Sequence, residues 1–280
     1  MPTAPTAIIT IIITRITTIS APRPEIGAYG TNLALADGPS AGTVEQHQAA
    51  GKSPSPDNAS LLYVWLSPSF PVGSFAFSHG MEWAVHEGQI RDAATTGDWI
   101  ATLLDRGSLR SDVIIASCAW RAVDAEDATT LRDLSELSLA LVGCRERHLE
   151  TSVQAGAFLT ALQSAWSAPR ITWACDVLAG EETSYPVALA IGAAAHGIPR
   201  HLMLEAFALA LVQNLVSATI RLSVIGQTDG QRIIARLMPK VRDMAAAADT
   251  FTLDDLGAAA FHSDIAAIKH ETQTTRLFRS

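Results

Sequence analysis

The sequence contains few cysteines. Cys118, Cys144 and Cys175 are the three that occur in 280 residues. They are odd in number and far apart, and none belongs to a C-x-x-C pair of the kind that binds metal. Such a set makes a poor disulfide framework. We therefore expect three free thiols in a reducing compartment.

Positive charge is also scarce. The chain has 20 Lys and Arg against 28 Asp and Glu, a formal net charge of −8. Nucleic-acid binding depends on clustered Lys and Arg, and no such cluster occurs. No uninterrupted apolar run reaches the roughly 20 residues of a membrane-spanning helix. The sequence therefore predicts a cytoplasmic protein that binds neither nucleic acid nor membrane.

Signatures of common enzymes are missing as well. The sequence has no G-x-S-x-G elbow, no G-x-x-x-x-G-K-[ST] phosphate loop and no G-x-G-x-x-G after a strand. Residues 145–150 alternate in charge, which is typical of a solvated helix face or a docking surface rather than of acid–base catalysis. We predict that the protein is not an enzyme.

The first 57 residues differ from the rest of the chain. Residues 7–20 are mostly Ile and Thr, which favour strand over helix. Their Arg15 lies inside the apolar stretch, whereas a secretory signal carries its charge before that stretch. Residues 21–57 are rich in Gly, Pro, Ala, Ser and Thr, as in linkers. We interpret residues 1–57 as a disordered, low-complexity arm and residues 58–280 as one folded domain.

From residue 58 onward, apolar residues recur mainly at helical spacing, and no strand hairpin is evident. Pro71 and Gly73 interrupt this pattern, Pro186 opens a helix and Gly197 ends it. Residues 167–184 are predicted to form a loop. The fold class predicted is all-α, a single-domain bundle of about ten helices. Beyond a first helix near residue 58, helices are expected over residues 75–86, 95–109, 111–125, 131–141, 145–166, 185–197, 200–224 and 230–247.

His79, Glu82 and His86 lie close to one face of a predicted helix. Two imidazoles and a carboxylate suit a borderline metal such as nickel or zinc. The spacing differs from that of H-E-x-x-H, and Gly80 weakens the helix. We therefore favour a structural role and keep the three as weak metal candidates. The alternative function is a helical metal-binding or metal-storage protein, which would bind metal tightly by itself.

Two further polar features stand out. Asn214, Ser217 and Arg221 form a stripe on the apolar helix predicted over residues 200–224, where polar groups need hydrogen bonds or water. The stripe is an internal network, a seam between dimer subunits or the wall of a wet passage, and the sequence alone favours the network. At the C-terminus, Leu277 and Phe278 are flanked by arginines, a combination that is favoured at protein-binding hot spots.

Five segments, in order and spacing, resemble the motifs of one family, the UreF urease accessory proteins. They begin with Trp-Leu-Ser-Pro-Ser-Phe-Pro-Val-Gly-Ser and continue to Met81 and Glu82. The resemblance covers residues 58–280, and the Ile/Thr-rich arm has no counterpart in it. The segments are residues 65–82, 150–156, 185–197, 214–231 and 270–280.

The resemblance implies a specific function. UreF proteins are all-helical, dimeric adaptors between UreD (also called UreH) and the GTPase UreG. The complex docks on apo-urease, and nickel reaches the urease active site as GTP is hydrolysed. For this chain, the resemblance implies a chaperone that regulates the GTPase, forms a homodimer, binds no cofactor stably and handles nickel transiently within the complex.

The resemblance also implies site residues. Phe75 and Arg276 match positions implicated in recruiting the GTPase, and the tail is expected to become ordered against UreD. The nickel passage of the family makes the stripe at Asn214, Ser217 and Arg221 a candidate passage wall or dimer seam. The charge of Arg221 favours the seam. The implied partner-binding residues are Phe75, His270, Glu271, Gln273, Arg276, Leu277, Phe278 and Arg279.

Overall fold

The computed structural model describes residues 56–248 and 250–280, with side chains from residue 58. The predicted arm, residues 1–57, therefore lies almost entirely outside the described residues. The described chain is helical and contains no strand. The predicted all-α fold is confirmed. The α-helices are α2 (Ser60–Trp65), α3 (Met81–His86), α4 (Ala93–Arg106), α5 (Ser108–Asp124), α6 (Ala128–Ala140), α7 (Arg145–Ala165), α8 (Pro169–Val177), α9 (Tyr185–Ala195), α10 (Arg200–Arg221), α11 (Gln227–Ala247) and α12 (Phe261–His270); the short 3-10 helices are η1 (Pro56–Ala59), η2 (Ser74–Ala76) and η3 (Leu253–Asp255).

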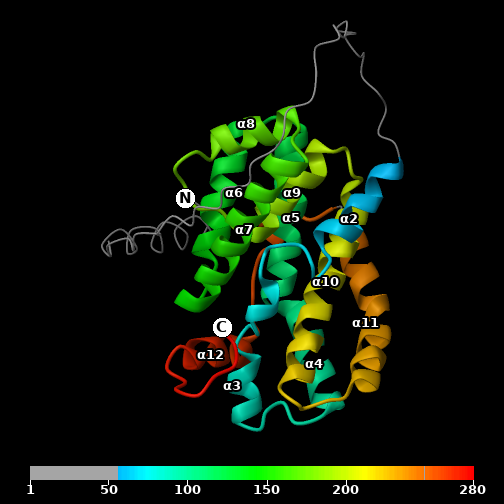
Figure 1. Ribbon diagram of the computed structural model, residues 1–280, viewed down its shortest axis with the longest axis vertical. Coiled ribbons are helices and arrows are strands. Elements are labelled where there is room, and N and C mark those ends of the chain that lie inside the picture. Colours follow the sequence, from blue (N-terminus) through cyan, green and yellow to red (C-terminus); the bar gives the residue numbers. More distant parts are fainter. Residues whose placement is uncertain (1–55, 249) are drawn as a thin grey trace, which may run out of the picture. The chain divides into compact units, whose positions relative to one another are not determined.

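Helix α9 forms the centre of the bundle (Figure 1). Its residues from Tyr185 to Ala194 are all buried, and it contacts α5, α6, α7, α8 and α10. A helix that is apolar on every side must be covered on every side. Its small residues allow this close approach: a Cβ on Gly192 would come within 2.8 Å of the Leu162 side chain.

Helices α4, α10 and α11 run alongside one another in a second group, which Figure 1 shows at the lower right. By length and composition α10 could cross a membrane, although polar residues interrupt its apolar sequence. Half of its most apolar window is buried in the bundle, where α10 contacts α3, α4, α5, α9 and α11. We therefore describe α10 as a core helix.

Two predicted segments are corrected. Residues 167–184 were expected to form a loop, but α8 begins there with Pro169 in its first turn, where the missing N–H costs no hydrogen bond. Residues 75–86 were expected to form one helix, but α3 begins only at Met81. His79 and Gly80 have φ angles of 56° and 76°, which interrupt the helix. Helix α12 was not predicted at all.

Gly80 is required where α12 packs across the start of α3. Its φ is left-handed, and a Cβ there would lie 2.5 Å from the backbone nitrogen of Ala267. Backbone atoms cannot move away as a flexible side chain can. The contact between α3 and α12 therefore depends on the absence of a side chain at this position.

The substitution Gly80→Ala should lower the free energy of unfolding by more than about 3 kcal/mol, because it adds both a left-handed non-glycine residue and a backbone clash. The matched control is Gly156→Ala. Gly156 is exposed on α7, and a Cβ added to it would meet no atom within 4 Å, so alanine should stabilise the protein by about 0.5–1 kcal/mol. Urea denaturation measures both. Equal, small effects of the two substitutions would contradict this account of Gly80.

Candidate partner-binding site

The C-terminal tail, residues 271–280, follows α12 and returns to the segment that precedes α3 (Figure 1). The Arg279 N–H donates to the Ala76 carbonyl at 2.8 Å, and the Ser78 N–H donates to the Ser280 carbonyl at 2.7 Å. Ser78 and Ser280 are 202 residues apart in the chain. These backbone hydrogen bonds fix the tail beside residues 71–78. We call these residues the Phe75 turn.

A buried carboxylate, Glu82, holds the middle of the tail. Its two oxygens accept the N–H groups of Leu277 at 2.6 Å and Phe278 at 2.9 Å. Phe278 is buried, so its ring anchors the tail on the core. Hydrogen bonds to an ionised acceptor are stronger than neutral ones. Glu82 therefore fixes the position of the tail backbone.

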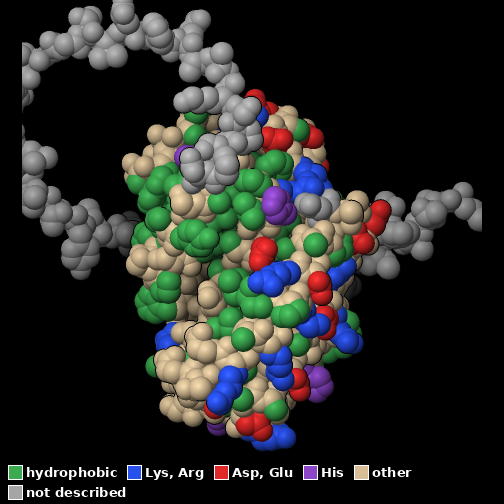
Figure 2. Space-filling model, turned by 90° about the vertical axis from the view of Figure 1, so that its right-hand side faces the viewer, with side chains coloured by type: hydrophobic (Ala, Val, Ile, Leu, Met, Phe, Trp, Pro, Cys, Tyr) green, Lys and Arg blue, Asp and Glu red, His purple; other side chains and the backbone are tan. Residues whose placement is uncertain are grey.

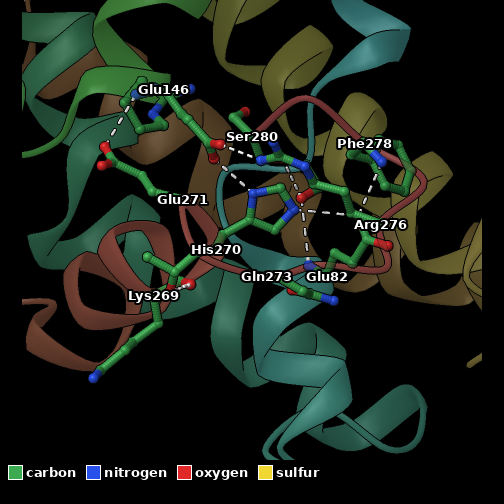
Figure 3. Close-up of polar contacts among 12 residues, drawn as sticks. Glu82, Glu146, Lys269, His270, Glu271, Gln273, Arg276, Phe278 and Ser280 are labelled. Carbon is green, nitrogen blue, oxygen red and sulfur yellow. Dashed lines mark hydrogen bonds and ion pairs between the residues drawn. The ribbon is translucent and has the colours of Figure 1, made fainter.

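His270, at the end of α12, lies between two carboxylates (Figure 3). Its Nδ1 is 2.6 Å from Glu146 and its Nε2 is 3.2 Å from Glu82. The ring is fully buried. Each ring nitrogen thus faces one carboxylate. Arg276 also pairs with Glu146, so one cluster holds two carboxyl groups, the His270 ring and a guanidinium.

The exposed side chains of the tail and of the Phe75 turn form a common surface. Phe75 is 64% exposed and Leu277 is 58% exposed. Arg221 joins the two segments, because its guanidinium donates to the Phe75 carbonyl and lies 4.3 Å from the centre of the Phe278 ring. We call this surface the tail patch. It consists of the exposed residues Phe75, Arg276, Leu277 and Arg279, together with Arg221, which is also exposed and joins the two segments.

The other tail residues singled out by sequence hold the tail in place. His270 and Phe278 are buried. Glu271 accepts the Arg145 N–H at 2.7 Å, at the start of α7. Gln273 is half-buried, and its amide donates to the Thr275 carbonyl at 3.0 Å. Sequence reasoning grouped all of these as partner-binding residues, whereas the structure separates an exposed set from a supporting one.

A second buried cluster lies behind the tail. His79 Nε2 is 2.7 Å from one oxygen of Glu150, and the other oxygen pairs with Arg147. The Ser280 hydroxyl donates to Glu150 at 2.7 Å. Burial opposes ionisation of Glu150, but Arg147 and His79 outweigh it and lower its pKa to about 2. Burial, aided by the charge of Arg147, lowers the pKa of His79, which is therefore neutral at neutral pH.

Three neighbouring cavities meet at His79. Their volumes are about 230, 20 and 60 Å³. Asp112 lines the first two, and Asn214 lines the third. Burial raises the pKa of Asp112 to about 6, against the opposing attraction of Arg147. A separate cavity of about 480 Å³ lies between α4 and the start of α12, and none of the predicted site residues lines it.

The structure separates the weak metal candidates. His79 faces Glu150, Glu82 faces the tail, and the His86 side chain is 63% exposed at 4.0 Å from Glu87. No group of three or more His, Cys, Asp or Glu is placed to hold a metal ion within residues 56–248 and 250–280.

The three residues of the polar stripe on α10 lie in different surroundings. Asn214 lines a cavity, Ser217 is exposed and Arg221 supports the tail patch.

Sequence reasoning missed the buried carboxylates of α7. Residues 145–150 were interpreted as a solvated or docking face, yet Glu146 and Glu150 are buried. A signal was present: Glu146, Glu150 and Gln154 continue, at four-residue spacing, the stripe that Phe158 and Leu162 extend into the core. The stripe predicts that these polar groups point inward.

Replacing Glu82 with alanine should release the tail, because two backbone N–H groups and the His270 ring lose their acceptor. Such hydrogen bonds to charged groups contribute about 1.5–3 kcal/mol each. We expect tryptic cleavage after Arg276 and Arg279 to accelerate more than tenfold, with the helical bundle retained by circular dichroism. Glu87→Ala, an exposed residue at the end of α3, is the control. Equal cleavage of both variants would show that Glu82 does not hold the tail.

Asp112→Asn should alter the pH dependence of stability. The pKa of Asp112 is about 6 in the folded protein and 3.8 ordinarily, so its contribution to stability is full below pH 3.8 and is lost as pH rises through 6. The asparagine variant should match the wild type near pH 4 and exceed it by about 1–2 kcal/mol above pH 7, an amount reduced for the partial exposure of this side chain. Urea denaturation in metal-free buffer measures this difference. A difference that does not change with pH would be inconsistent with a raised pKa of the partly buried Asp112 carboxyl.

Comparison with known proteins identifies the family. The UreF family model matches residues 90–238. The urease accessory protein UreF of Xanthobacter autotrophicus is 48% identical over 240 residues, which cover 86% of this chain and 98% of the relative. The protein of the same name from Rhodopseudomonas palustris strain BisA53 is 48% identical over 219 residues, 78% and 92% of the two chains. That of Methylorubrum populi is 45% identical over 223 residues, 80% and 99%. The chain belongs to the UreF family of urease accessory proteins.

Proposed function

We propose that the protein is a non-enzymatic adaptor that bridges UreD (UreH) and the GTPase UreG on apo-urease, so that nickel is inserted and urease matures. The observation that carries the proposal is the tail patch. Phe75 and Arg276 lie some 200 residues apart in sequence, yet the Phe75 turn and the tail are hydrogen-bonded side by side. The two positions linked by resemblance to GTPase recruitment thus belong to a common exposed surface.

The chemistry of the tail patch suits a protein partner. An exposed aromatic ring and an exposed Leu lie among arginines, and such residues dominate binding hot spots. Arg276 is oriented by Glu146 and is 39% exposed. A side chain that is already ordered loses less entropy on binding. Its fork of N–H donors suits a carboxylate or phosphate of the GTPase, in a positioning or gating role rather than as an arginine finger.

A second surface supports the contact with UreD. Phe261, Ile265 and Ile268 are 68%, 56% and 49% exposed on α12. Their spacing places them on one face of the helix. An exposed apolar face of this kind is typical of a protein interface. The tail that follows is already docked on the bundle, so UreD would bind an ordered α12 and tail rather than fold them.

The remaining parts of the proposal concern assembly and nickel. Figure 2 looks onto the side that carries α2, α10 and α11 and shows hydrophobic side chains gathered on part of it. On α2, Tyr63 is 83% exposed and Val64 is 46% exposed, which supports a homodimer contact there. Nickel is handled transiently in the assembled complex, with no cofactor bound stably, and the protein acts in the cytoplasm.

The test is capture of UreD and UreG by the full-length chain. We expect a ternary complex with the wild type and at least tenfold weaker capture of UreG by Arg276→Ala, with UreD capture retained. Arg276→Lys keeps the charge near Glu146 but loses the fork of donors, so it should be intermediate. Arg232→Ala, an exposed arginine on α11, is the control. Wild-type binding by Arg276→Ala, with its tail still resistant to trypsin, would refute the assignment of this residue.

A further inference from the structure

Glu146, in the first turn of α7, divides its two carboxylate oxygens between two partners. One oxygen pairs with the Arg276 guanidinium in the tail, and the other lies 2.6 Å from Nδ1 of His270 at the end of α12 (Figure 3). The carboxylate is buried, with 7% of the residue exposed. Glu146 therefore fixes both the end of the helix that precedes the tail and the guanidinium within the tail.

The helix end that carries Glu146 is held in turn by the tail. The residue that caps α7, Cys144, makes no side-chain hydrogen bond to it. Instead, a Glu271 oxygen accepts the Arg145 N–H at 2.7 Å and the Glu146 N–H at 3.4 Å. The first N–H groups of a helix need acceptors from outside the helix, and a negative charge is favourable there. Glu146 thus projects from a capped helix end, which makes it a rigid support for Arg276.

The contact with Glu146 occupies only part of the Arg276 guanidinium, because a guanidinium has five N–H donors. The bond to Glu146 comes from Nη1, and no other hydrogen bond of this side chain occurs within residues 56–248 and 250–280. The side chain is 39% exposed. A carboxylate accepts two parallel N–H groups from one edge of a guanidinium. The edge formed by Nε and Nη2 can therefore take a second carboxylate while Glu146 keeps Nη1.

The surroundings of Arg276 indicate which anion it meets. It lines none of the four cavities described above, so it faces open surface rather than a pocket for a small anion. The rest of the tail patch consists of exposed Phe75 and Leu277 and two further arginines, in a chain whose net charge is −8. A positive patch with apolar members on an acidic protein is complementary to an acidic protein face. A side-chain carboxylate of a protein partner therefore fits Arg276 best.

We infer that Glu146 is a positioning residue for partner binding: it holds Nη1 of Arg276 so that the opposite edge of the guanidinium receives a carboxylate of the GTPase. The inference rests on the proposed function, in which Arg276 recruits UreG. Glu146 is buried and acts on the partner through Arg276. An exposed arginine loses rotamer freedom when it binds, and the contact with Glu146 removes part of that freedom beforehand. Glu146 thus raises the affinity for UreG from beneath the surface that UreG contacts.

The test is a double-mutant cycle on the full-length chain, with the dissociation constant for UreG measured in the presence of UreD. Glu146→Gln keeps the shape of the side chain and removes its charge. It should weaken UreG binding about three- to tenfold, the cost of ordering one long side chain, and by less than about twofold in the Arg276→Ala background. UreD binding and resistance to trypsin at Arg279 should be retained. Glu136→Gln makes the same chemical change at an exposed position of α6 and should bind UreG like the wild type.

Several results would overturn the inference, and each has a different meaning. Unchanged UreG binding by Glu146→Gln, while Arg276→Ala binds more weakly, leaves the adaptor function standing and removes the positioning role. An equal loss in both backgrounds, with faster cleavage after Arg279, would show that Glu146 only stabilises the tail. A loss with GTP-loaded UreG but not with nucleotide-free UreG would assign Arg276 to a phosphate instead of a protein carboxylate. Wild-type UreG binding by Arg276→Ala would refute the proposed GTPase contact and the positioning role with it.

Discussion

The structure depends on three buried carboxylates, Glu82 on α3 and Glu146 and Glu150 on α7, which tie the end of the described chain to these two helices. Each accepts hydrogen bonds or ion pairs from the tail or from the end of α12. A buried carboxylate without such partners would be strongly unfavourable. Phe278 and Ser280 therefore anchor the tail on the core, and the three carboxylates have all their partners only when residues 271–280 are in place.

This arrangement explains how a surface for partners is built from distant segments. The Phe75 turn is short and contains Pro71 and Gly73, and it would have little to fix it in isolation. A backbone hydrogen bond from the tail and the guanidinium of Arg221 fix its position. Within the tail patch, Arg276 and Leu277 are therefore oriented by the buried carboxylates Glu146 and Glu82. Phe75 is held instead by Arg221 and by the backbone of the tail.

The helical architecture was largely predictable from sequence, because long helices such as α7 and α10 carry an apolar pattern or clear boundaries. The short first helix, α2, was also predicted, but α8 and α12 were not. Helix α8 has a proline in its first turn and lies among residues typical of loops, and α12 exposes Phe261 and Ile265, which blurs its apolar face. Packing stabilises such helices, and packing is not visible in local sequence.

For the site, the sequence identified residues but not their surroundings. Phe75 and Arg276 were singled out, and the structure places their segments together. Glu146 and Glu150 were taken for surface charges, because an alternating charge pattern is the same whether the face meets water or a buried histidine. The pairing of His270 with Glu82 joins residues 188 apart in sequence, and no local rule predicts a contact at that separation.

Ser280 gives the tail patch and the cavities a thermodynamic connection. Its hydroxyl shares Glu150 with His79, while its backbone continues directly from the exposed Arg279. Any event that draws the tail away from the bundle removes a donor from Glu150 and so changes the carboxylate that orients the His79 ring. By reciprocity, a change at the ring alters the free energy of holding the tail. The tail patch and the cavities at His79 are thus coupled through the Glu150 carboxylate. This coupling does not require the helices to move.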